Sequence, residues 1–126
     1  MTFEINAAEW AQVASRAAAG ELALDPEVGK NLERVCDDHL DVLREALLSS
    51  DSVSHISGFG PFNSSKALEK KFSLTGSGGD RSLDAALKQH IDTVLAAKEA
   101  IVKGMANYRA QDTATHDRIA GAEGQL

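Results

Sequence analysis

The sequence predicts an all-α protein built around an antiparallel hairpin of two long helices. Three observations lead to this prediction. Apolar residues recur at spacings of three and four, which is the helical period. Ala and Leu, which favour helices intrinsically, supply most of the apolar mass, while aromatic residues make up only 5% of the chain. No stretch alternates strictly between apolar and polar residues as a half-buried strand would. We therefore expect one helical domain over residues 1–126.

A short first helix is predicted at about 6–19. Asn6 and Glu9 have the spacing of a capping box, and Gly20 ends the pattern. Between them lies the apolar run Trp10, Val13, Ala14 and Ala17.

The first long helix is predicted at about 25–50. Asp25 is an N-cap acid, Pro26 occupies the first helical position, and Glu27 adds a favourable charge to the first turn. Apolar residues then recur as far as Leu47. The opposite, outward-facing side carries the acids Glu33, Asp37, Asp38, Asp41 and Glu45.

A long central loop joins the two long helices. Residues 52–65 are rich in Gly, Ser, Pro and Asn, which is loop composition, yet they include Phe59 and Phe62. Two interpretations of these rings stay open. Either they plug the end of the hairpin, which we favour because exposed aromatic tips are uncommon on soluble monomers, or they present an apolar tip to a partner or a membrane. A short helix at 65–72 and a flexible breaker at 74–79 complete the connection.

The second long helix is predicted at about 80–116, with Asp80 as N-cap and an apolar stripe that Lys98 interrupts. A flexible tail is predicted at about 119–126. One partner helix cannot cover a stripe wider than about 100°. We therefore expect the chain to pair with a second helical protein, as a homodimer or a heterodimer.

Composition and charge exclude several classes of function. The formal net charge of −6 argues against a nucleic-acid partner, because phosphate binding needs clustered Lys and Arg. No segment approaches the roughly 18 apolar residues of a transmembrane span. The first residues lack the basic and apolar regions of a Sec signal peptide. Cys36 is the only cysteine, so no intramolecular disulfide can form.

No residue cluster predicts catalysis, a cofactor or a metal site. The glycine-rich stretch before Asp80 lacks the Lys-Ser/Thr of a P-loop, so we interpret it as a linker. A Cys36/His39 nucleophile is disfavoured because the neighbouring aspartates raise the pKa of the thiol. We expect Cys36 to be a small residue of the core. The four histidines are too scattered to bind zinc: His39, His55, His90 and His116.

Four features follow one another in a fixed order along the chain. A long amphipathic helix is followed by the bend Gly58-Phe59-Gly60-Pro61-Phe62, a second long helix, and Tyr108-x-x-x-Asp112 near its end. This order resembles the WXG superfamily (ESAT-6-like) of type VII secretion substrates, in particular its larger actinobacterial members. Phe59-Gly60 takes the place of the family's Trp-x-Gly.

The resemblance implies a non-enzymatic protein that is made in the cytoplasm and exported, uncleaved, to the medium or the cell surface. It implies that Tyr108 and Asp112 belong to the secretion signal, read by the export ATPase or a dedicated chaperone. The protein would act through protein contacts, as a secreted effector or as the helper of a larger toxin. The alternative is a cytoplasmic helical adaptor or chaperone that is never exported.

Overall fold

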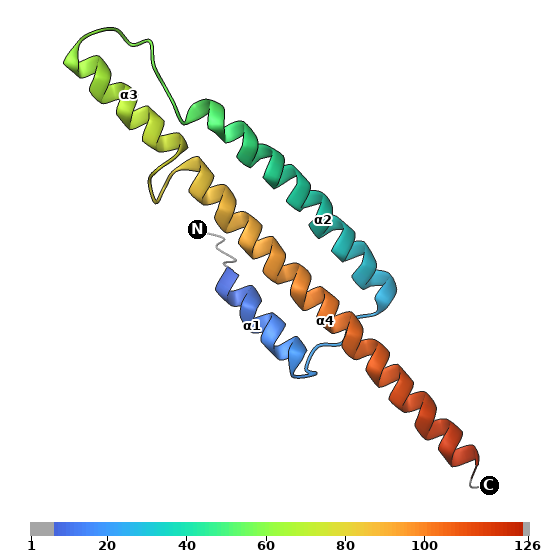
Figure 1. The fold of residues 1–126 in the computed structure, drawn as a ribbon. Helices are drawn as coiled ribbons and strands as arrows, with labels where there is room; N and C mark the ends of the chain where they lie inside the picture. The colour runs from blue at the N-terminus through green and yellow to red at the C-terminus, as the bar shows by residue number, and fades with distance from the viewer. Residues whose placement is uncertain (1–6, 125–126) are drawn as a thin grey trace. The chain divides into compact units, whose positions relative to one another are not determined.

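The computed structural model describes residues 7–124 and confirms the all-α class (Figure 1). The described residues contain no strand. They form two short and two long α-helices and one 3₁₀ turn: α1 (Ala7–Ala18), α2 (Pro26–Ser49), η1 (Ser50–Val53), α3 (Asn63–Gly76) and α4 (Leu83–Glu123).

The chain divides into two compact units, and both long helices contribute to each of them. Unit 1 comprises the described residues up to Asp37 and those from Thr93 onward; unit 2 is Asp38–Asp92.

In unit 1, α1 ends in a Schellman motif at the predicted glycine. Gly20 has a φ of +84°, a conformation that glycine adopts without steric penalty. The Gly20 amide donates to the Ala17 carbonyl and the Glu21 amide donates to the Arg16 carbonyl, both at 3.0 Å. These two bonds satisfy carbonyls that the helix end would otherwise leave free. The predicted N-cap, Asn6, lies outside the described residues.

The start of α2 is as predicted. The Asp25 carboxylate accepts a hydrogen bond from the Glu27 amide at 2.9 Å. The Asp25 carbonyl accepts the first helical bond, from the Gly29 amide at 2.8 Å. Pro26 stands at the first helical position, where its missing N–H removes no hydrogen bond.

Small side chains make up most of the core of unit 1. A Cβ added to Gly29 would collide with the Met105 side chain, and one added to Gly104 would lie 3.2 Å from the Leu24 Cβ. The Leu24 amide also donates to the Gly104 carbonyl at 2.9 Å. Gly104 therefore weakens α4 locally but allows the chain before α2 to lie directly against it. The buried apolar residues of this core are Ala14, Ala17, Ala97, Ala100 and Met105.

Asp37 differs from the prediction of a solvent-facing acid. Its carboxylate accepts a hydrogen bond from Lys98 Nζ at 2.6 Å, and this bond raises the pKa of Lys98 above its usual 10.5. Lys98, which interrupts the apolar stripe of α4 in the sequence, therefore pairs with α2. Both side chains keep substantial exposure, so the pair adds little to stability.

In unit 2, the two leucines Leu40 and Leu43 are buried, and serine hydroxyls organise the connections. Ser73 Oγ accepts from the Ile56 amide at 2.9 Å. Asp84 accepts from Ser82 Oγ and, at 2.7 Å, from Ser77 Oγ. These two bonds, Ser82 first, hold the pKa of Asp84 below its ordinary 3.8.

The later helix boundaries differ from the predicted ones. The short helix extends to Gly76 instead of residue 72. Gly76 is buried, and a Cβ added to it would collide with the Val53 carbonyl. α4 begins at Leu83 rather than near Asp80. Ser82 rather than Asp80 accepts its first helical bond, from Ala86.

The predicted flexible tail is also wrong as far as residue 123. The structure continues α4 to Glu123. Ala recurs through this stretch and no proline interrupts it, so local propensity favours a helix.

Candidate docking site

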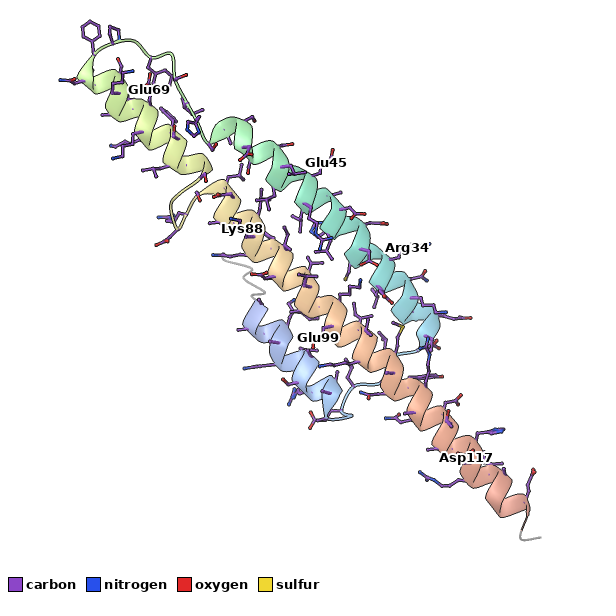
Figure 2. The ribbon with its side chains drawn as sticks, viewed as in Figure 1. Arg34, Glu45, Glu69, Lys88, Glu99 and Asp117 are labelled. Atoms are coloured by element: carbon purple, nitrogen blue, oxygen red, sulfur yellow. The ribbon has the colours of Figure 1, made fainter. Side chains whose placement is uncertain are left out.

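The last third of α4 projects beyond the core of unit 1. Among residues 7–124, Met105 is the last buried one, and every residue from 108 to 124 is exposed. Figure 1 shows this red segment of α4 continuing past the end of α1. In Figure 2 its side chains stand out around the helix, Asp117 among them.

Tyr108 and Asp112 lie at the base of this segment. They are four residues apart on one continuous helix, so they share a face. Tyr108 is 39% exposed and Asp112 is exposed. Among the described residues, no hydrogen bond or ion pair is assigned to either side chain. The structure thus places the predicted pair together and leaves both groups accessible.

The same face continues beyond the predicted pair. Thr115 and Ile119 follow Asp112 at spacings of three and four, and Ile119 is 57% exposed. Ile119 was not among the predicted site residues because it lies in the stretch that was predicted to be a flexible tail. The continuing three-four spacing was the signal that could have identified it.

Asn107, which was not among the predicted site residues either, fixes the base of this segment. Its amide nitrogen donates to the carbonyl of Ala17, at the end of α1, and to that of Leu22 at 2.8 Å. It thereby ties the chain before α2 and the end of α1 to α4, one residue before Tyr108. In the sequence, an asparagine three residues after Gly104 is only a weak sign that its side chain binds distant carbonyl groups.

The bend residues in unit 2 require their glycines. Gly58 and Gly60 have φ values of +96° and +106°, a region that other residues rarely adopt. Between them, the Phe59 amide donates to Glu69 Oε1 at 3.2 Å; Glu69 is labelled on α3 in Figure 2.

The two phenylalanines of the bend behave differently. The Phe59 ring meets the Phe72 ring edge to face, with centroids 5.7 Å apart, a favoured aromatic arrangement. Phe62 is 72% exposed. Only Phe59 therefore folds back onto the chain, and the plug interpretation is wrong for Phe62.

An apolar hollow lies beside Phe59, and we call it the α3 hollow. Its volume is about 380 Å³. It is lined by Val53, Ile56, Phe59, Phe72, Thr75, Gly76 and Leu83. Its one polar side chain, Thr75, donates its hydroxyl to the Lys71 carbonyl at 3.2 Å. The hollow therefore suits an apolar group.

The other candidate groups considered were the Cys36 thiol and the possible metal ligands. Burial, followed by the charge of Asp37, raises the pKa of the Cys36 thiol, which disfavours a nucleophilic thiolate. Within residues 7–124, no three His, Cys, Asp or Glu side chains are grouped as metal ligands would be. None of the helices in this part of the chain is long and apolar enough to cross a membrane.

Comparison of the chain with protein-family models, curated proteins and solved structures finds no match. The resemblance to the WXG superfamily thus depends on the residues alone.

Proposed function

We propose that the protein is a non-enzymatic substrate of a type VII secretion system and acts through protein contacts, as an effector or as the helper of a toxin. The observation that carries this proposal is the uncovered end of α4, which presents Tyr108 and Asp112 on one face. A tyrosine offers a rigid apolar ring with one polar tip. The nearby carboxylate can orient a basic group on the export ATPase or chaperone.

We further propose that α2 and α4 form the helical hairpin typical of these substrates. In unit 1, Gly29 lies against Met105, and Asp37 pairs with Lys98. Residue numbers along α4 thus fall as those along α2 rise, as an antiparallel pair requires.

A helical partner is part of the same proposal. Val28, Leu32 and Val35 share one face of α2 in unit 1 and are 51%, 41% and 61% exposed. Covering such a stripe with a helix from a second hairpin protein would remove its apolar surface from water.

Export can be tested in an actinobacterial host that carries a type VII system. Tagged wild-type chain, Tyr108→Ala and Asp112→Ala would be quantified in culture supernatant and cells, with a cytoplasmic marker to report lysis. We expect wild type in the supernatant and both variants retained. Gln111→Ala and Asp117→Ala, exposed positions of the same helix, are the matched controls and should be exported. Equal retention of every form would overturn the proposal and favour a cytoplasmic adaptor.

A further inference from the structure

The α3 hollow has an apolar lining with one lysine beside it. We propose that it binds the hydrocarbon chain of a single-chain anionic amphiphile, such as a fatty acid, whose carboxylate pairs with Lys71. All residues of this site belong to unit 2. They differ from those of the docking site on α4, so the proposal does not depend on export.

Three segments of unit 2 form the walls of the hollow. The segment between α2 and α3 runs beside α3 (Figure 1) and is bonded to it. The Ile56 amide donates to Ser73 Oγ at 2.9 Å, and the Phe59 amide donates to Glu69 Oε1 at 3.2 Å. Leu83, the first residue of α4, supplies the third wall. Because both amides already donate within the chain, the lining offers a ligand apolar contacts rather than these hydrogen-bond donors.

The apolar lining is open to water. Phe59, Phe72 and Leu83 are 44%, 52% and 45% exposed. Covering such side chains with hydrocarbon removes apolar surface from water, which is favourable. A flexible hydrocarbon chain can follow an open, curved surface of this kind.

One lysine of α3 stands on the side that lines the hollow. Lys71 precedes Thr75 by four residues, so the two lie about 40° apart around the helix. Lys70 lies about 140° from Thr75, and Lys66 pairs with Glu69 at 3.7 Å. Lys71 is exposed, and no ion pair among the described residues involves it. It comes before every α3 residue of the lining, so its charge lies at one end of the hollow.

An acid stands beside Leu83, the lining residue that follows α3. Asp84 accepts hydrogen bonds from Ser82 and, at 2.7 Å, from Ser77. These bonds, Ser82 first, keep the pKa of Asp84 low, so the group is charged at neutral pH. A bound carboxylate is therefore favoured at Lys71 and disfavoured near Leu83. The amphiphile should lie with its anionic head at Lys71 and its tail toward Leu83.

This arrangement suits an anionic amphiphile better than other apolar occupants. A neutral apolar molecule would make no use of Lys71, and a cationic one would be repelled by it. A protein segment would bring main-chain N–H and C=O groups against a lining that has few partners for them, which is unfavourable. A hydrocarbon chain brings no such groups.

Equilibrium dialysis of the full chain against radiolabelled dodecanoate, kept below its micellar concentration, tests the proposal. We expect saturable binding of one molecule per chain. Octanoate should bind at least about tenfold more weakly, because four fewer methylene groups are buried. Dodecanol, which has the same chain length without the charge, should bind about three- to fivefold more weakly than dodecanoate. This series uses wild type alone, so it does not depend on whether a variant folds.

Two matched pairs of variants locate the site. Lys71→Met should weaken dodecanoate binding about three- to fivefold, as loss of an exposed ion pair does, and should leave dodecanol binding unchanged. Lys70→Met, on the other side of α3, should change neither. Thr75→Phe fills the hollow and should abolish binding of both ligands. Thr113→Phe makes the same change at an exposed position of α4 and should have no effect. Circular dichroism checks that each variant is folded.

Several results would overturn the proposal. These are no binding of dodecanoate to wild type, equal binding of octanoate, equal effects of the two lysine variants, or normal binding by folded Thr75→Phe. Binding to vesicles containing one-third phosphatidylglycerol, with none of monomeric dodecanoate, would overturn it and assign the hollow to a membrane surface. Self-association in sedimentation velocity that Thr75→Phe abolishes, again without dodecanoate binding, would overturn it and assign the hollow to a second copy.

Discussion

At the scale of single residues, burial and the nearby charges together set the pKa of the Cys36 thiol. Burial contributes most to its raised pKa, Asp37 raises it further, and Lys98 lowers it. Because Asp37 and Lys98 also bind each other, removing either one breaks the same ion pair while changing the thiol pKa in opposite directions.

We predict that this opposition is visible in alkylation kinetics. Only the thiolate reacts, so at fixed pH Asp37→Asn should speed the reaction of Cys36 with iodoacetamide and Lys98→Met should slow it. The rate-against-pH profile should move to lower pH in the first variant and to higher pH in the second. If both variants react faster, loss of the ion pair acts by loosening the packing, and the electrostatic account is wrong.

At the scale of helices, the glycines of α3 and α4 have different roles. Gly76 is buried against the Val53 carbonyl, whereas nothing lies within 4 Å of a Cβ added to Gly121. The first is required by packing. The second only weakens its helix.

Replacement of each glycine by alanine should therefore have opposite effects. Gly76→Ala forces backbone to move and should lower the free energy of unfolding by about 1–3 kcal/mol. Gly121→Ala should be neutral or raise helix stability by up to about 1 kcal/mol. Urea unfolding followed by circular dichroism measures both. An unchanged unfolding midpoint for Gly76→Ala would show that α3 can separate from the Val53 carbonyl without cost.

Local chemistry explains which helix ends could be predicted from sequence. The ends at Gly20 and Asp25 depend on backbone and capping bonds formed within a few residues, so a local pattern is sufficient. The contact of Gly76 with the Val53 carbonyl, by contrast, joins residues more than twenty positions apart, and no local signal reports it. The partners of Lys98 and Asn107 are likewise distant in sequence. The pair Tyr108 and Asp112 was identifiable because its spacing is local.

At the scale of the molecule, the end of α4 contributes nothing to the core. We predict that removing residues 109–126 leaves the midpoint of thermal unfolding unchanged and lowers only the helical circular dichroism signal. Removing residues 104–126 should lower the midpoint, because it also deletes Gly104, Met105 and Asn107. A fall in the midpoint with the shorter deletion would show that the exposed segment packs on the rest of the chain.

The exposed helix also has a kinetic consequence for any partner that reads it. The roughly sixteen exposed residues at the end of α4 form a helix that is only marginally stable in water, so this segment opens and closes easily while the rest of the chain stays folded. A receptor must then order the segment as it binds, and part of the interaction free energy is lost to that ordering. The complex should therefore form readily but have a short residence time.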